Sequence, residues 1–143
     1  MKNGDHVYLD SNIVITILEQ TAPLNRPQKR FIDALETGQL TGISSHLTLA
    51  ECLIKPMRES NEQAIEAVLQ FLENQEHVEL LPVSPDILVK AAGIRAVSGT
   101  KLPDAIHLAS AVAAGCQTFL SDDKGIRMPA SVARIGFAEL NFD

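Results

Sequence analysis

Apolar residues along the chain gather in short runs that alternate with longer stretches of helical spacing. The short runs predict four strands and a candidate fifth, at 6–9, 41–44, 78–83, 117–120 and 132–135. Stripes at every third and fourth position predict helices after residue 10, over 28–36 and 45–57, from Asn61 onward, and over 84–97 and 103–114. Strands that alternate with helices in this way form parallel sheets covered on both faces. We therefore predict an α/β fold with a four- to five-stranded parallel sheet, in one domain over residues 1–143.

The helical stripes also predict which residues face inward. In the helix over 45–57, the inward residues are expected to be Leu47, Ala50 and Ile54. Pro23 and Pro27 are expected to separate the first helix from the second, and Pro56 to kink or stop the third. In the helix over 103–114, alanine recurs at every fourth position, which predicts a small-residue face that approaches the sheet closely: Ala105, Ala109 and Ala113.

Net charge and composition do not decide whether the protein binds a nucleic acid. The chain has a net charge of −6, which at first argues against a nucleic acid. Six glutamates without any Lys or Arg lie between Glu59 and Glu79, however, and they predict a solvated acidic surface. If a few of the remaining acids bind divalent cations, the rest of the protein is nearly neutral. Acidity therefore does not exclude a nucleic-acid partner.

Other features of the composition predict a cytoplasmic protein. No apolar run approaches the roughly 20 residues that a membrane-spanning helix requires. The N-terminus reads as a first strand and not as a signal peptide. Cys52 and Cys116 lie far apart and lack the spacing of metal ligands, which predicts buried, reduced thiols.

Several carboxylates fall where one edge of the predicted sheet should lie. Asp10 directly follows the first strand, and Asp122 and Asp123 follow the fourth. Asp104 lies in the first turn of its helix, and Glu51 about two turns into the helix after the second strand. Each acid alone also fits a turn, a helix cap or an exposed helical position. Ligands of open α/β sheets bind at the carboxyl ends of the strands, so we predict that these acids meet in a site.

Clustered carboxylates point to metal-dependent chemistry. They repel one another and raise each other's pKa unless cations neutralise them. Oxygen ligands select hard cations, Mg²⁺ or Mn²⁺, and Mg²⁺ typically takes one or two carboxylates together with substrate phosphate. Such a site activates water for attack on a phosphodiester without a nucleophilic Ser or Cys.

Four segments carry a family resemblance. They are YLDSNI at 8–13, LAE at 49–51, LPDAIHLASA at 102–111 and FLSDDK at 119–124. In this order and spacing they resemble the four motifs of PIN domains, over nearly the whole chain, and the third is the most specific. The resemblance implies a Rossmann-like sheet, Mg²⁺- or Mn²⁺-dependent cleavage of single-stranded RNA and often a homodimer. Many bacterial members of this length resemble VapC-type toxins, which a small antitoxin protein holds inactive.

The resemblance also implies roles by position. Asp10 and Asp104 match the metal ligands, and Glu51 matches a third acid beside the metal or its water. Asp123 matches the fourth acid, while Asp122 occupies a variable position, so which of the two acts stays open. Asn12 and Ser121 would orient ligands or phosphate by hydrogen bonding.

Basic residues and histidines complete the set of candidates. Two groups are candidates for contacts with the phosphate backbone, although both also fit ordinary solvated charges: Arg26, Lys29 and Arg30, and Lys124 and Arg127. His107 follows Asp104 by one helical turn and is either a hydrogen-bond donor behind the acids or a structural residue. The other histidines, His6, His46 and His77, have no ligand spacing.

Other function classes fit less well. A haloacid-dehalogenase-type phosphatase needs an Asp where Asn12 stands, and a receiver needs an acceptor Asp at the end of the third strand, which continues Pro82-Val83-Ser84. No glycine-rich phosphate loop ending in Lys-Ser or Lys-Thr occurs. The remaining alternative is a catalytically silent PIN fold that binds RNA or serves as a scaffold. DNA also stays open as the substrate, because the same metals serve either backbone.

Overall fold

Five parallel strands form one sheet in the computed structural model, which describes residues 1–73 and 78–141. The strands are β1 (His6–Leu9), β2 (Thr41–Ser45), β3 (Val78–Leu81), β4 (Thr118–Leu120) and β5 (Ala133–Ile135). Their order is β3-β2-β1-β4-β5, and every neighbouring pair is parallel. This confirms the predicted α/β class and the fifth strand. β3 ends before Pro82, two residues earlier than predicted, because proline has no N–H to donate to the ladder.

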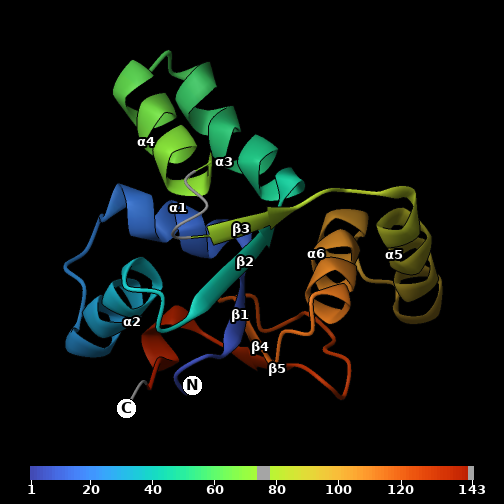
Figure 1. Cartoon of the computed structure of the whole chain (residues 1–143). Helices are drawn as coiled ribbons and strands as arrows, with labels where there is room; N and C mark the ends of the chain where they lie inside the picture. The colour runs from blue at the N-terminus through green and yellow to red at the C-terminus, as the bar shows by residue number, and fades with distance from the viewer. Residues whose placement is uncertain (74–77, 142–143) are drawn as a thin grey trace.

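Helices cover both faces of the sheet (Figure 1). They are α1 (Ser11–Glu19), α2 (Arg26–Glu36), α3 (His46–Arg58), α4 (Glu62–Glu73), α5 (Pro85–Ser98) and α6 (Leu102–Ala113), followed by a short 3-10 helix η1 (Phe137–Glu139). Alternation along β1 divides the core: Val7 and Leu9 pack with the first four helices, and Tyr8 packs with α6. The predicted site at the carboxyl ends of the strands therefore has helices from both layers beside it.

Side-chain caps explain where most of these helices begin. Asp10, Ser45 and Ser84 cap α1, α3 and α5 by accepting hydrogen bonds from backbone N–H groups. Asn25 forms a capping box at α2, which places Pro27 in the first turn of that helix and not before it as predicted. Pro56 lies inside α3, which ends two residues later, at Arg58.

The inward face of α3 differs from the predicted one. Thr48 and Cys52 are buried, whereas Ala50 is exposed and Ile54 is 55% exposed. The buried side of α3 is partly polar because the Thr48 hydroxyl lies 2.6 Å from the Ser44 hydroxyl of β2. Leu47 is partly buried against the core cluster between α5 and α6, so the predicted apolar stripe is confirmed at the start of the helix and wrong at Ala50 and Ile54.

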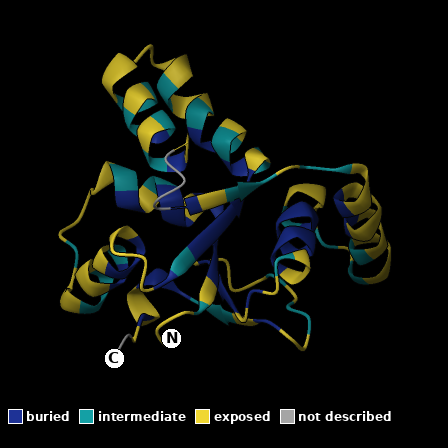
Figure 2. Cartoon of the chain, viewed as in Figure 1, coloured by how far each residue is buried: buried dark blue, intermediate teal, exposed yellow. Residues whose placement is uncertain are grey.

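Two of the three alanines predicted to approach the sheet, Ala105 and Ala109, face a neighbouring helix instead. Ala105 and Ala109 are buried against Ile87 and Ala91 of α5, while Ala113 is exposed. Leu108 and Ala111 are the α6 residues that pack with Tyr8 and Phe119 of the sheet. Figure 2 shows the result, a largely buried α6 between the sheet and an α5 that is exposed on its outer side.

Two expectations from composition can be compared with the fold. Both cysteines are buried and free, as predicted. No helix within residues 1–73 and 78–141 is long and apolar enough to cross a membrane. His77 lies outside the described residues.

The sheet has a topological switch point beside its first strand. The chain leaves β1 to form β2 on one side and later returns to form β4 on the other. In open α/β sheets, the crevice at the carboxyl ends of two such strands is where ligands bind. Asp10 and Ser121 directly follow β1 and β4, so the fold brings these two residues to that crevice.

Candidate active site

Asp10 is held in place from two directions at the switch point. Its Oδ1 accepts a hydrogen bond from the backbone N–H of Ser11 at 2.8 Å, and its Oδ2 accepts one from the Ser121 hydroxyl at 2.7 Å. The residue is only 5% exposed. One carboxylate therefore caps α1 and also links the ends of β1 and β4.

The two adjacent acids after β4 point to different places. Asp122 is turned towards η1, where its Oδ1 accepts a hydrogen bond from the Phe137 N–H at 2.8 Å. The backbone N–H of Asp123 donates to the Ser121 hydroxyl at 3.1 Å, and the charge of Asp123 acts on Asp104. Of this pair, it is Asp123 that faces the other acids.

Asp104 is the acid at which the other charges converge. Partial burial raises the pKa of its carboxyl group, and the negative charges of Asp10, Asp123 and Glu51 raise it further, against a smaller opposing effect of His107. No side-chain hydrogen bond reaches its carboxylate from any described residue. The structure thus brings together the four acids that the sequence suggested, and one of them has no hydrogen-bonded partner in the described chain.

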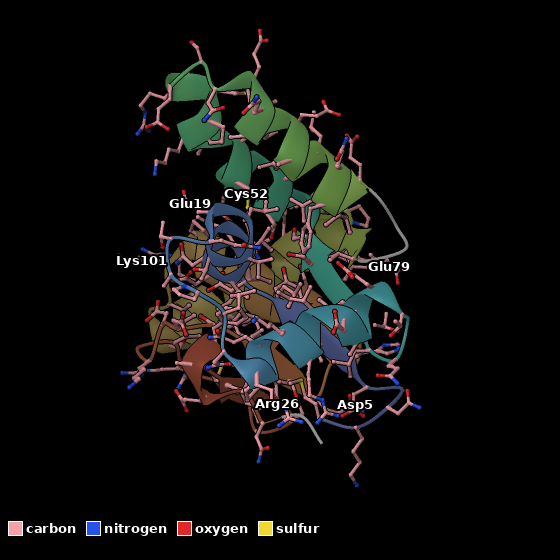
Figure 3. The ribbon with its side chains drawn as sticks, turned by 90° about the vertical axis from the view of Figure 1, so that its left-hand side faces the viewer. Asp5, Glu19, Arg26, Cys52, Glu79 and Lys101 are labelled. Carbon is pink, nitrogen blue, oxygen red and sulfur yellow. The ribbon has the colours of Figure 1, made fainter. Side chains whose placement is uncertain are left out.

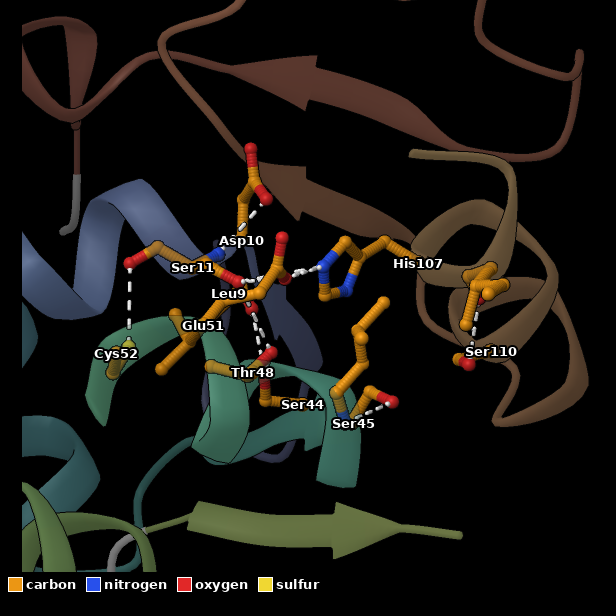
Figure 4. A network of polar contacts seen from close by, with 12 residues as sticks. Leu9, Asp10, Ser11, Ser44, Ser45, Thr48, Glu51, Cys52, His107 and Ser110 are labelled. Atoms are coloured by element: carbon orange, nitrogen blue, oxygen red, sulfur yellow. Dashed lines mark hydrogen bonds and ion pairs between the residues drawn. The ribbon is translucent and has the colours of Figure 1, made fainter. Parts of the chain in front are cut away.

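Glu51 has the opposite environment. Its Oε1 accepts a hydrogen bond from the Ser11 hydroxyl at 2.6 Å and lies 2.7 Å from Nε2 of His107 (Figure 4). Burial would raise the pKa of Glu51, but the hydrogen bonds from His107 and Ser11 outweigh it and hold the pKa below its ordinary value. The carboxylate is consequently anionic and fixed through one oxygen.

A buried polar network lies behind Glu51. His107 is 1% exposed, and its Nδ1 lies 2.7 Å from the Tyr8 hydroxyl. On the β2 side, the Ser44 hydroxyl donates to the carbonyl oxygen of Leu9 at 2.7 Å. His107 could be singled out in the sequence by its spacing from Asp104. Tyr8 and Ser11 could not, because one reads as a core strand residue and the other as part of a helix start.

A cavity of about 330 Å³ opens beside the acids. Asp104 and Asp123 line it together with Lys101 and Arg127, and the hydroxyl residues Ser98 and Thr100 contribute to the same wall. Neither Lys101 nor Arg127 has an ion pair or side-chain hydrogen bond within the described chain. Arg127 was a sequence candidate and Lys101 was not, because a lone Lys before a helix has no distinguishing pattern.

The predicted basic groups are not on one surface. Arg26, Lys29 and Arg30 lie on α2, which Figure 1 shows on the opposite side of the molecule from α6. Figure 3 likewise shows Arg26 apart from Lys101. Lys124 is exposed in the loop that leads to Arg127, and Asn12 is exposed in the first turn of α1. The four acids and the cavity therefore have Lys124 and Arg127 beside them, but not the basic residues of α2.

The donor chemistry of the site suits a hard divalent cation, although no ligand cage is preformed. Within residues 1–73 and 78–141, no three His, Cys, Asp or Glu side chains are arranged so that they could hold an ion by themselves. Mg²⁺ requires fewer protein ligands than that, because it commonly uses one or two carboxylates and keeps water or phosphate in its other positions. The uncompensated charge at Asp104 fits such a partly protein-bound cation.

A comparison with protein-family models identifies one family. The family model described as PIN domain matches residues 7–131. No curated protein matches the chain significantly.

Solved structures share the fold at low sequence identity. VapBC2 from Rickettsia felis, bound to a DNA fragment from its promoter, aligns with a TM-score of 0.71 at 12% identity, over 92% of this chain and 98% of that one. A toxin–antitoxin complex from Klebsiella pneumoniae gives a TM-score of 0.59 at 23% identity, over 89% and 95% of the two chains. VapBC-5 from Mycobacterium tuberculosis gives 0.55 at 22% identity, over 92% and 98%.

Proposed function

The chain belongs to the PIN domain family, and from this premise we propose that it is a Mg²⁺- or Mn²⁺-dependent endoribonuclease that hydrolyses phosphodiester bonds of single-stranded RNA. One observation supports this more than any other. Four acids from separate parts of the chain converge at the switch point, and partial burial together with the charges of the other three raises the pKa of Asp104. Carboxylates are gathered at such electrostatic cost where a cation and a phosphate will balance them.

The acids have different roles in this proposal. Asp10 and Asp104 would hold the cation, and Asp123 adds a further carboxylate beside Asp104. A cation bound there would acidify a water molecule and neutralise charge on the phosphate oxygens. Glu51 has one carboxylate oxygen, Oε2, without a hydrogen bond from any described residue, and this oxygen accepts the proton of the attacking water. Ser121 orients Asp10 through the hydrogen bond between them, and Asn12 is exposed close by for contact with phosphate.

The RNA backbone is proposed to continue through the cavity beside Asp104. Lys101 and Arg127 are cations there without partners in the described chain, and phosphate contacts of this kind position a strand without reading its sequence. Lys124 lies in the neighbouring loop and extends the same surface. The α2 group is a weaker candidate, because α2 lies away from this cavity.

The biological setting is proposed from the family and its structural neighbours. Several neighbours with the same fold are described as toxin–antitoxin complexes. We infer that this chain is the toxin of such a pair and that it acts in the cytoplasm. Its proposed protein partners are a small antitoxin and a second copy of the chain itself. Expression of the chain alone should then arrest growth, and Asp104→Asn should relieve the arrest.

The deciding experiment is cleavage of labelled single-stranded RNA by the purified protein with Mn²⁺ or Mg²⁺. We expect cutting that EDTA abolishes and that Asp104→Asn lowers by at least about 100-fold, the typical cost of losing one group that stabilises charge in a transition state. Asp33→Asn is the matched control, because Asp33 is an exposed acid on α2. If Asp33→Asn and Asp104→Asn lost activity equally, the cluster of acids around Asp104 would not be the active site.

The same assay tests the alternative that the chain is a catalytically silent PIN fold. A folded wild-type protein that binds RNA but cuts neither RNA nor DNA with either metal would contradict the nuclease proposal and support a binding module. Cutting of DNA alone would keep the site and change the substrate.

A further inference from the structure

Two donors from different helices meet on one oxygen of Glu51. Ser11 of α1 donates its hydroxyl proton to Oε1 at 2.6 Å, and Nε2 of His107 on α6 lies 2.7 Å from the same atom. Glu51 itself belongs to α3. Three helices from both layers of the fold are therefore joined at one carboxylate oxygen, while its other oxygen is left free of hydrogen bonds from the described chain.

The direction of the hydrogen bonds follows from Glu51. A carboxylate oxygen can only accept, so Nε2 of His107, 2.7 Å from Oε1, is the ring atom that donates to it. In the neutral ring Nδ1 is then the acceptor, and the buried hydroxyl group of Tyr8, 2.7 Å away, donates to it. Tyr8 therefore stabilises the tautomer whose Nε2–H is directed at Glu51.

The phenol is well placed for this purpose. Its ring stacks on Phe119 of β4, with ring centroids 5.1 Å apart and an interplanar angle of 7°. The ring of His107 meets it edge-on at 5.8 Å. Since Tyr8 belongs to the central strand β1 and Phe119 to its neighbour, the sheet itself fixes the start of the hydrogen-bond chain.

We propose that Tyr8 and His107 are positioning residues of the nuclease, a relay from the sheet core that holds Glu51 by one oxygen and directs the other at the attacking water. The relay rests on the proposed function in one respect, because it assumes that Glu51 is the proton acceptor. A glutamate side chain has three rotatable bonds, and the fixed geometry of a catalytic group depends on supporting contacts of this kind.

A double-mutant cycle tests whether His107 acts through Glu51. His107→Leu removes the donor at similar bulk and should lower kcat about 10- to 100-fold, the usual cost of losing a supporting contact, with KM little changed. His107→Gln keeps an N–H donor on its side chain and should recover part of that loss. In the cycle, His107→Leu should cost nothing further in a Glu51→Gln background.

Three results would overturn the relay. One is a full, additive loss of kcat when His107→Leu is combined with Glu51→Gln. Another is equal activity of the Leu and Gln variants at position 107, because only the latter keeps a donor. The third is a loss of kcat in His107→Leu that merely follows the fraction of unfolded protein, measured by circular dichroism at the assay temperature.

A second readout is independent of activity and of the metal. Two-bond proton–nitrogen NMR correlations of the imidazole identify which ring nitrogen of His107 carries the proton. In the wild type we expect the proton on Nε2, and in Tyr8→Phe a mixture of both tautomers. A wild-type ring protonated on Nδ1 alone would overturn the relay. If the tautomers are as expected but the wild type cuts no nucleic acid, the nuclease proposal fails while the anchoring of Glu51 by Tyr8 and His107 stands.

Discussion

Glu51 and Asp104 lie at the same edge of the sheet, but the chain surrounds them in opposite ways. Glu51 receives two hydrogen bonds on one oxygen, from Ser11 and His107, and its pKa is lowered. Asp104 receives none from the described residues, and its pKa is raised. Behind Glu51 lies a buried polar network. Beside Asp104 lies an open cavity lined by Lys101 and Arg127, which have no ion pair with any described residue.

This difference indicates which half of the site the protein completes by itself. The Glu51 half is assembled in the free protein, since every donor it needs is part of the fold. The Asp104 half has charges of both signs that face an open cavity and do not neutralise one another, so its partners are expected to come from solution. Preorganised and ligand-dependent halves should respond differently to mutation, to salt and to pH.

The largest expected effect separates the two neighbouring acids after β4. Asp123→Asn should lower metal-dependent cleavage on the order of 100-fold, because it removes a charge beside Asp104. Asp122→Asn keeps an oxygen that can accept from the Phe137 N–H, so it should change cleavage only a few-fold. Single-turnover rates for both variants at saturating metal measure the contrast. Equal losses in the two variants would mean that the loop as a whole, and not one acid, is required.

The next effect concerns the cations of the open half. Lys101→Ala and Arg127→Ala should weaken RNA binding several-fold and leave kcat nearly unchanged, because phosphate contacts position the strand. For each contact that is lost, the slope of log affinity against log salt should become shallower by about 0.7, the value for single strands. Fluorescence anisotropy with labelled RNA at several salt concentrations measures both quantities.

Two lysines elsewhere make this test of the cavity specific. Lys90→Ala, on the exposed side of α5, should leave the salt dependence of binding unchanged. Lys29→Ala on α2 tests the basic group that the fold places away from the cavity. If Lys29→Ala flattens the salt dependence more than Lys101→Ala does, the RNA path crosses α2 and the cavity assignment is wrong.

The preassembled half is also the part that the sequence revealed least. Asp10, Glu51, Asp104 and Asp123 could be found because several acids were expected at one edge of the sheet, although each of them alone also fits a turn, a cap or a helical position. The convergence of these acids then followed from parallel topology, in which strand ends share one edge. The family resemblance favoured Asp123 over Asp122, but the residues alone left the choice open, because adjacent residues after a strand differ only in how the loop turns.

Helix faces were predicted less well than helix positions, for a related reason. On α3 the buried side includes Thr48, whose hydroxyl is close to Ser44, and polarity hid that side from a search for apolar stripes. On α6, Ala105 and Ala109 form the predicted close-packing surface and Ala113 does not, and small residues do not reveal what they approach, which is α5. Hydrogen bonds between distant residues, such as the contact of Tyr8 with His107, leave no periodic pattern in a sequence.

The smallest expected effect is a stability difference of opposite sign between the two halves. In EDTA at neutral pH, Glu51→Gln should lower the melting temperature, because an anion with a lowered pKa stabilises the fold. That contribution is present above its ordinary value of 4.5 and is lost as pH falls through the lowered folded-state pKa. Asp104→Asn should raise the melting temperature by up to a few degrees, because it removes an anion that the fold disfavours.

The pH dependence distinguishes this explanation from a general effect of removing a charge. The gain from Asp104→Asn should shrink as pH falls through the raised folded-state pKa and vanish below the ordinary value of 3.8, where the wild-type carboxyl group is protonated in both the folded and the unfolded state. Asp33→Asn, an exposed acid without a resolved partner, should shift the melting temperature little at any pH. Scanning calorimetry from pH 3 to 8 (roughly the range over which both carboxyl groups change charge) measures all three. If both Glu51→Gln and Asp104→Asn were stabilising, Glu51 would be strained by its neighbours like Asp104, and the two halves of the site would be alike.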